Sequence, residues 1–270
     1  MGGVASSCAS KSGVIVGSAK QVRRTYSTAA LSHLKVSNAI KTVIIQGNTP
    51  SMVVEAPENL LPYLQIKQEG SSCSVGMDRR YVYMNVNITV TIQTPYLAHL
   101  ELSGGAKARF KGSFAGPTFT ADISGAGEMD GLNLQTADCS LDLSGASELD
   151  ASIEANNLST DLSGASEATL VLKKIRRIVG SVSGASDLTL SGTARTMELD
   201  LSGSSSLSAR SLLLQGARMS LSGSSQAQIN TQKELAYNLS GASILKDYGK
   251  GRITSEQATG SSRYISVPAR

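Results

Sequence analysis

Three aspartates recur along the chain at an almost constant spacing. Asp122, Asp142 and Asp161 lie 20 and 19 residues apart, and each stands two residues before a Ser-Gly pair. If successive repeats stack in register, neighbouring carboxylates lie about 5 Å apart, and each pair repels by about 3–4 kcal/mol at an effective dielectric constant of 20. Screening by solvent and salt, raised pKa values or bound Ca²⁺, which prefers oxygen ligands, would each relieve this repulsion.

We interpret these aspartates as part of a solvated acidic face and keep a calcium site at Asp122, Asp142 and Asp161 as the alternative. The Gly-Gly-x-Gly-x-Asp pattern of calcium-binding solenoids is absent from the sequence. A second acidic row follows the same Ser-Gly pairs by four residues and comprises Glu128, Glu148, Glu167 and Asp187. The sequence contains no phosphate-cradling glycine loop, and we expect no cofactor.

One strong basic cluster comprises Lys173, Lys174, Arg176 and Arg177. Such a run is most often a solvated face, and this one lies inside a repeat of ordinary length. The alternative is contact with an anionic surface, such as lipid head groups or acidic glycans. Nucleic-acid binding usually combines basic residues with aromatic residues that stack on bases. No aromatic residue flanks this cluster, so we expect no nucleic-acid partner.

Residues that could form a catalytic site are sparse. The two histidines, His33 and His99, lie outside the regular repeat, and we interpret them as ordinary surface or cap residues. Gly-x-Ser recurs, but Gly-x-Ser-x-Gly does not occur. Carboxylate pairs at a glycosidase-like spacing are plentiful, yet residues 120–236 contain no aromatic residue for a sugar platform. We therefore expect no enzyme, and keep a carbohydrate-active β-helix enzyme acting on envelope or environmental polysaccharide as the alternative.

The cysteines Cys8, Cys73 and Cys139 are odd in number and form no Cys-x-x-Cys motif, which favours neither a disulfide framework nor a zinc site. Residues 1–25 contain no apolar signal core, and we expect a flexible leader or the remnant of a signal. Cys8 follows small residues, as the attachment cysteine of a lipoprotein does. A lipid anchor at Cys8 in the full-length form is therefore an alternative.

An internal repeat must position all of these side chains. Ser-Gly pairs recur 18 to 21 residues apart, beginning at Ser103, Ser124, Ser144, Ser163, Ser183, Ser202, Ser222 and Ser240, with Thr259-Gly260 as a ninth. The consensus reads Leu-Ser-Gly-Ala-Ser, and apolar and polar residues alternate on both sides of it. This pattern predicts a strand, a turn and a second strand in each repeat. We expect the alanines to fill the corners and many serines to line outward ladders.

A 20-residue period of strands and turns predicts an all-β parallel β-helix, or β-solenoid, which we expect to be right-handed. The composition agrees with a narrow core of small and aliphatic residues, since the chain has 42 serines, 26 glycines and 4% aromatic residues. Residues 101–267 are expected to form the Ser-Gly-repeat solenoid. Residues 26–100 have longer extended stretches and are expected to open the same sheet system and to cap it.

The segments Leu31–Asn38, Val43–Gly47 and Val53–Leu64, together with the Leu-Ser-Gly-Ala-Ser array, resemble a family. It is the family described as "putative auto-transporter adhesin, head GIN domain", a domain of unknown function abundant in Bacteroidetes, and the resemblance covers about residues 20–265. It implies a non-enzymatic β-solenoid adhesin or scaffold of the cell envelope, periplasmic or on the cell surface, that is usually made with an export or lipoprotein signal. It supplies no catalytic residues.

Charge is distributed unevenly along the chain. Residues 1–100 carry 9 basic and 4 acidic groups, residues 101–170 carry 3 and 11, and residues 201–270 carry 8 and 3. An acidic belt between two basic ends favours electrostatic self-association. The expected partner is otherwise a glycan or a protein that contacts the broad serine-rich faces.

Overall fold

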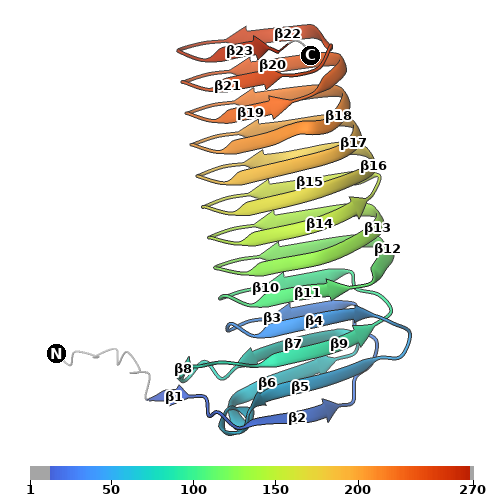
Figure 1. Ribbon diagram of the computed structural model, residues 1–270, viewed down its shortest axis with the longest axis vertical. Coiled ribbons are helices and arrows are strands. Elements are labelled where there is room, and N and C mark those ends of the chain that lie inside the picture. Colours follow the sequence, from blue (N-terminus) through green and yellow to red (C-terminus); the bar gives the residue numbers. More distant parts are fainter. Residues whose placement is uncertain (1–12, 268–270) are drawn as a thin grey trace, which may run out of the picture.

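The alternation of apolar and polar residues becomes strands with one buried and one exposed side. In β14 (Glu148–Glu154), for example, Leu149, Ala151 and Ile153 are buried, whereas the residues between them reach solvent. The computed structural model describes residues 13–267, and the strands stack into a β-solenoid (Figure 1). The predicted all-β solenoid with coils of about 20 residues is thereby confirmed.

The repeat region holds most of the strands. They are β10 (His99–Leu102), β11 (Lys107–Lys111), β12 (Ser113–Ile123), β13 (Glu128–Leu143), β14, β15 (Asn157–Leu162), β16 (Glu167–Val182), β17 (Asp187–Leu201), β18 (Ser206–Leu221), β19 (Gln226–Ile229), β20 (Thr231–Leu239), β21 (Ile244–Asp247), β22 (Arg252–Ala258) and β23 (Arg263–Ser266). Each pairs in parallel with the strand one coil away, as β16 does with β17.

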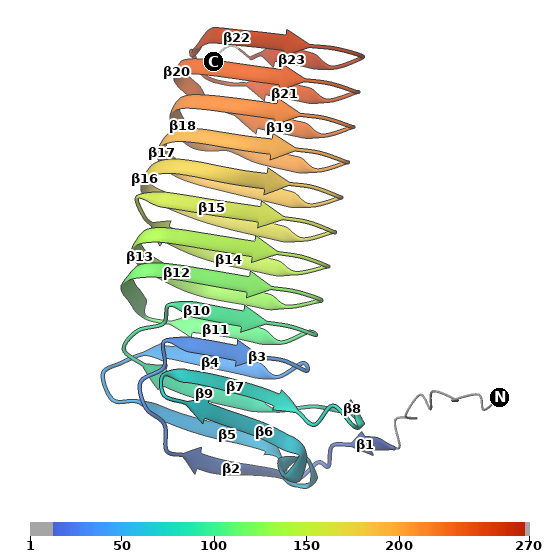
Figure 2. The same ribbon diagram turned by 180° about the vertical axis from the view of Figure 1, so that it is seen from behind.

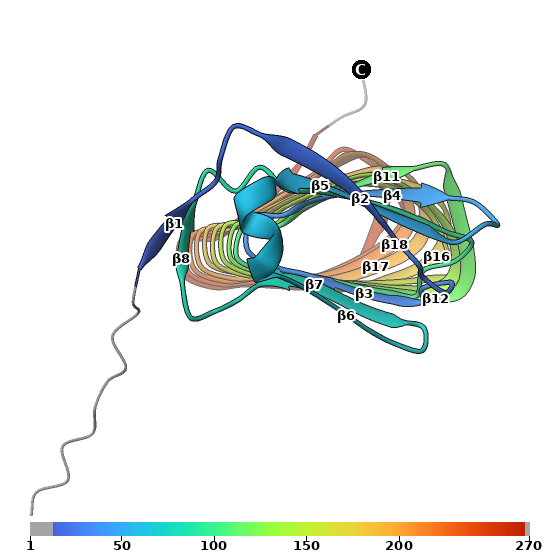
Figure 3. The same ribbon diagram turned by 90° about the horizontal axis from the view of Figure 1, so that it is seen from below.

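Each coil is flattened and has two broad faces, which Figure 3 shows along the solenoid axis. We call the residues that lead into a Ser-Gly turn face A, such as 138–143, and those that follow it face B, such as 148–154. The turn closes one narrow end of the coil. At the other end the chain passes through a corner from face B to face A, so strands as long as β13 contribute to both faces.

The parallel register stacks like residues above one another. Leu143, Leu162 and Val182 are partners on successive strands, and all three are buried. A slip of one residue would turn this column out to solvent, which is why the apolar pattern fixes the register. Burial of each such side chain contributes roughly 1.5–3 kcal/mol.

The Ser-Gly turn packs differently from our expectation. The alanine after the glycine, such as Ala146, points to solvent, whereas the second serine, such as Ser147, is buried inside the corner. Ser147 Oγ donates to the carbonyl oxygen of Ser144 at 3.1 Å. Ser166 and Ser225 form the same bond with Ser163 and Ser222, whereas Ser205 Oγ has no hydrogen-bond partner within the described residues. The buried serines form an internal ladder comprising Ser147, Ser166, Ser186, Ser205, Ser225 and Ser243.

The N-terminal region joins the same stack, but not in chain order. Its elements are β1 (Val14–Val16), β2 (Gln21–Tyr26), β3 (His33–Val36), β4 (Lys41–Gln46), β5 (Ser51–Pro57), the 3-10 helix η1 (Glu58–Tyr63), β6 (Leu64–Glu69), β7 (Ser72–Met77), β8 (Val82–Met84) and β9 (Thr89–Thr94). In Figure 2, the coil of β3 and β4 lies between that of β7 and β9 and that of β10 and β11. The chain therefore adds a coil below β3 and β4 before it returns to begin the regular array.

The bottom of the stack contains antiparallel pairs, namely β2 with β5, β5 with β9 and β6 with β7. Antiparallel strands at the end of a parallel stack present an edge with a different hydrogen-bond pattern from that of the repeats, which agrees with a capping role. That this region caps the solenoid stays a prediction.

The expected flexible leader, residues 1–25, is corrected for its second half. β1 pairs with β8, and β2 pairs along its length with β5. Val22 and Tyr26 order this segment because they pack half-buried against the core. Residues 1–12, with Cys8, lie outside the described residues. Within residues 13–267, no helix has both the length and the apolar character needed to span a membrane.

Candidate binding face

The recurring aspartates form a continuous row on face A. Asp122 is the register partner of Asp142, and Asp142 is the partner of Asp161. Glu101 extends the row below Asp122, and Ser181 follows Asp161 above. Adjacent strands of a sheet lie about 4.8 Å apart, so the row places acidic side chains side by side along the solenoid.

The carboxylates towards the two ends of this row have a basic or hydrogen-bonding partner, whereas the carboxylate in its middle has no basic partner. Glu101 forms an ion pair with Lys35, Asp122 lies 3.5 Å from His99 Nε2, and Asp161 accepts a hydrogen bond from Ser181 Oγ at 2.6 Å. Asp142 has no basic partner within residues 13–267.

The pKa of Asp142 is raised above its ordinary value. Partial burial is the largest cause, followed by repulsion from the carboxylates of Asp122 and Asp161, and a hydrogen bond from Ser140 lowers the pKa in part. Burial and the neighbouring carboxylates thus both disfavour the ionised form of Asp142. The central carboxylate is exposed and accepts a hydrogen bond from Ser140 Oγ, but it has no basic neighbour within residues 13–267.

Polar rows flank the aspartates on face A. Thr120, Ser140 and Ser159 form one row, and Thr118, Asp138 and Asn157 form the next. Two hollows lie along these rows. The first is lined by Glu101, Asp122, Asp142, Asp161, Ser181 and the turn serines beside them, and the second by the two flanking rows together with Arg177 and Val179.

The calcium site at Asp122, Asp142 and Asp161 stays a prediction. Within the part of the chain that the structure describes, no three or more His, Cys, Asp or Glu side chains are grouped so that they could hold a metal ion. The three carboxylates form a row one strand apart, whereas Ca²⁺ takes six to eight oxygens around a common point.

Face B carries the second acidic row, and this row begins with an ion pair. Glu128, Glu148 and Glu167 are register partners, and Lys107 precedes Glu128 and forms an ion pair with it. On the same strands, Arg109 binds the Asp130 carboxylate through its Nε and one terminal nitrogen. These ion pairs are confined to the coil of Glu128 and Asp130, since Glu148 and Glu167 form no ion pair within residues 13–267.

The basic cluster lies at the corner opposite the Ser-Gly turns. Lys174 Nζ lies 2.9 Å from Glu154 Oε1, and an Arg177 terminal nitrogen lies 3.0 Å from Glu198 Oε2. Lys173 and Arg176 are exposed and form no ion pair within residues 13–267. Contact between this cluster and an anionic surface stays a prediction.

The described cysteines point into the core. Cys73 and Cys139 are free and buried. Burial raises the pKa of Cys73 to about 11 and that of Cys139 to about 12, so both thiols are protonated near neutral pH. They are packing residues in this fold.

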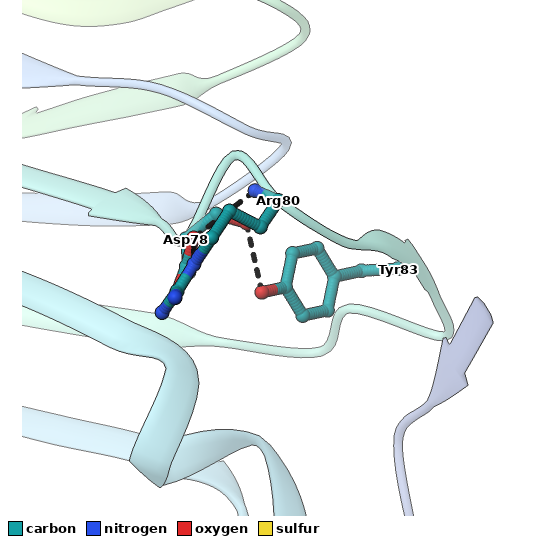
Figure 4. Close-up of polar contacts among 3 residues, drawn as sticks. All are labelled: Asp78, Arg80 and Tyr83. Carbon is teal, nitrogen blue, oxygen red and sulfur yellow. Dashed lines mark hydrogen bonds and ion pairs between the residues drawn. The ribbon is translucent and has the colours of Figure 1, made fainter. Parts of the chain in front are cut away.

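A polar cluster that the sequence did not reveal fixes the turn before β8 (Figure 4). The buried Asp78 carboxylate binds Arg80 Nε at 3.0 Å and a terminal nitrogen at 2.6 Å, and Tyr83 Oη donates to the Asp78 carbonyl at 2.9 Å. Hydrogen bonds from Arg80 lower the pKa of Asp78. The rings of Tyr63 and Tyr81 pack beside Tyr83. This cluster anchors β8 to the solenoid.

The histidines lie together, although the sequence analysis treated them as separate residues. His33 in β3 and His99 in β10 are register partners, and their ring centres lie 5.8 Å apart. A signal for this pairing was present. Each histidine stands four residues before the serine of a bend, Ser37 or Ser103.

A β-solenoid whose coils present flat, polar faces is the class of protein that these observations define. Within that class, the chain belongs to the family described as "putative auto-transporter adhesin, head GIN domain", whose model matches residues 30–171 and again residues 149–251. The resemblance seen in the sequence is thereby confirmed. The overlapping matches are expected for a repeat protein.

Solved structures share the fold over nearly the whole chain. A putative adhesin from Parabacteroides merdae is 16% identical with a TM-score of 0.72, and the match covers 94% of this chain and 99% of that chain. A putative adhesin from Parabacteroides distasonis is 17% identical with a TM-score of 0.71, covering 94% and 100%. A putative lipid binding protein from the same organism is 15% identical with a TM-score of 0.70, also covering 94% and 100%. No curated protein matches the chain in sequence.

Proposed function

We propose that the protein is a non-enzymatic binding protein of the cell envelope, an adhesin whose ligand lies along face A. One observation carries the proposal. The row of Asp122, Asp142 and Asp161 keeps its register across three coils, and its central carboxylate has no basic partner within the described residues. A chain-like ligand with its own regular repeat could satisfy such a row at several points at once.

A glycan is the ligand class that fits the side chains of this face best. Its rows present carboxylate, hydroxyl and amide groups, which can each accept or donate hydrogen bonds to sugar hydroxyls. Two hollows run along these rows on face A. Asp142 and Ser144 line one hollow, and Ser140 and Asn157 line the other. Many weak contacts along an extended face suit adhesion, where avidity replaces single-site affinity.

Family membership and the adhesin labels of its structural neighbours support a location at the cell surface or in the envelope. One neighbour is labelled a putative lipid binding protein, so lipid belongs among the ligands to be tested. A lipid anchor at Cys8 would hold the N-terminal end of the solenoid near a membrane and would present the repeat coils outward.

A glycan array tests the proposal. The purified protein is applied with and without 5 mM EDTA, and bound and released sugars are both measured. We expect reversible binding to a subset of glycans, independent of EDTA and without release of reducing sugar. Binding that EDTA abolishes would favour the calcium alternative. Release of reducing sugar would favour the alternative, a carbohydrate-active enzyme, and would contradict the proposed function.

A further inference from the structure

The chain has two histidines, and the fold places them next to each other. His33 and His99 are 66 positions apart in sequence, yet β3 and β10 pair in parallel with these residues opposite each other. Their rings lie 5.8 Å apart between centres and are tilted by 42°. Two imidazoles that share one metal ion at about 2.1 Å per nitrogen have ring centres at most about 6.5 Å apart. The observed separation falls inside that limit.

One ring nitrogen of each histidine lies near an oxygen of a neighbour, at hydrogen-bond distance for His33 and at ion-pair distance for His99. His33 Nδ1 lies 2.8 Å from Ser32 Oγ, and that hydroxyl in turn donates to Ser71 Oγ at 2.8 Å. His99 Nε2 lies 3.5 Å from the Asp122 carboxylate. Metal-binding histidines commonly donate one ring N–H to such an oxygen, which leaves the other nitrogen with a free electron pair. Here the remaining nitrogens are Nε2 of His33 and Nδ1 of His99.

A surface hollow surrounds the pair. It is lined by His33, His99, Lys35, Lys67, Glu69, Ser72, Ser74 and the inner residues Leu34 and Cys73. The charge of Lys35 is balanced by Glu101, and the hollow also contains one lysine, Lys67, and one carboxylate, Glu69, whose charges offset each other. The hollow is open to solvent, so water or an outside ligand can reach a metal ion held there.

We propose that His33 and His99 bind one divalent transition-metal ion, Cu²⁺ or Zn²⁺, through His33 Nε2 and His99 Nδ1. Imidazole nitrogen suits these metals, and Cu²⁺ binds most tightly among divalent first-row ions. Asp122 and Ser32 are positioning residues that orient the two rings. The described residues supply no third His, Cys, Asp or Glu close enough to complete a group of three. Two protein ligands therefore leave coordination positions for water or for a donor from a partner.

A site with two protein ligands is expected to bind the metal ion with modest affinity, and this affinity is expected to fall at acid pH. An imidazole binds a metal ion only when it is neutral. Acidification is therefore expected to release the metal, because protons compete for the same imidazole nitrogens.

The test uses the full chain without an affinity tag, in a Cys8→Ser background that removes one competing thiol, while the other two cysteines, Cys73 and Cys139, are buried. Isothermal titration with Cu²⁺ and with Zn²⁺ is expected to give one site per chain. Electron paramagnetic resonance of the Cu²⁺ form is expected to show two imidazole nitrogens. His33→Asn and His99→Asn are each expected to weaken binding at least about tenfold, and circular dichroism verifies that each variant is folded.

Asp122→Asn and Asp161→Asn separate a positioning effect from a general loss of negative charge. Both remove a carboxylate from the same row, but only Asp122 lies beside His99. Asp122→Asn is expected to weaken Cu²⁺ binding about tenfold and to alter the nitrogen signature of the spectrum, whereas Asp161→Asn leaves both unchanged. Equal loss in the two variants, one imidazole or none in the spectrum, or unchanged binding by the His33→Asn/His99→Asn double variant would overturn the proposal.

Discussion

A Cβ atom on Gly145 would lie 2.5 Å from the carbonyl oxygen of Gly125, one coil below. The same carbonyl accepts a hydrogen bond from the backbone N–H of Ala146 at 2.7 Å. Gly145 has a φ of 80°, a conformation that residues with a Cβ rarely adopt. The Ser-Gly turns thus stack backbone on backbone, and this contact explains why a glycine recurs in each repeat.

Replacement of Gly145 by alanine should therefore destabilise the solenoid. The strained backbone alone costs roughly 1–3 kcal/mol, and the clash with Gly125 adds to it, so we expect Tm to fall by roughly 5 °C or more. Gly216→Ala is the matched control. A Cβ there would lie 3.6 Å from the Glu234 carbonyl oxygen, an ordinary contact. Thermal unfolding followed by circular dichroism checks both, and equal Tm values would contradict the stacking argument.

The raised pKa of Asp142 predicts a pH-dependent effect on stability. A carboxyl whose pKa is higher in the folded state contributes stability that is fully present below its ordinary pKa and is lost as pH rises through the folded value. Asp142→Asn removes the repulsion at neutral pH. With solvent screening of this exposed group, we expect Tm at pH 7 to rise by roughly 1–3 °C, and the gain should vanish below about pH 4.

Asp200→Asn is the control for this experiment. Asp200 occupies the same column, but its register partners are Ser181 and Ser220, so it lacks flanking carboxylates. Melting curves across pH 3.5–8 should show little change for this variant. A similar pH-dependent gain in both variants would show that the neighbouring carboxylates are not the cause.

The basic corner should contribute unequally to binding of anionic surfaces. Lys174 and Arg177 are already paired with Glu154 and Glu198. Lys173 and Arg176 are not paired within the described residues, so their charges are available to an outside anion. Lys173→Glu/Arg176→Glu should lower the salt concentration that elutes the protein from heparin more than Lys174→Glu/Arg177→Glu does. The opposite order would rule out this use of the cluster.

The C-terminal end and the middle of the solenoid should differ in local stability. Every residue of β22 is exposed, whereas β16 and β17 are paired on both sides and bury alternate residues. Local opening is easiest where few apolar contacts oppose it. Hydrogen exchange followed by mass spectrometry should show β22 and β23 exchanging first and β16 and β17 last. Uniform exchange along the stack would instead indicate all-or-none opening.

The regular part of the fold was predictable because its information is local. The Leu-Ser-Gly-Ala-Ser repeat fixes both the turn and the period, and in-register stacking then places Asp122 beside Asp142. The prediction that alanines fill the inside of the turn was wrong, because the alternation of apolar and polar residues does not reveal that the second serine is buried in the corner. The stacking order of the N-terminal coils was also missed. The return of the chain to place β10 on β3 is a long-range pairing that no short motif records, and the contact between His33 and His99 depends on it.

The measurement that tests the account most directly compares two arginine substitutions at matched positions on opposite faces. Ser140→Arg blocks the centre of face A, and Thr169→Arg places the same side chain on face B, where Thr169 is likewise half-buried in mid-strand. Affinity for the strongest glycan from the array is measured by biolayer interferometry. We predict at least a tenfold loss for Ser140→Arg and less than a twofold change for Thr169→Arg. Unchanged affinity for Ser140→Arg, or equal loss in both variants, would contradict binding along face A.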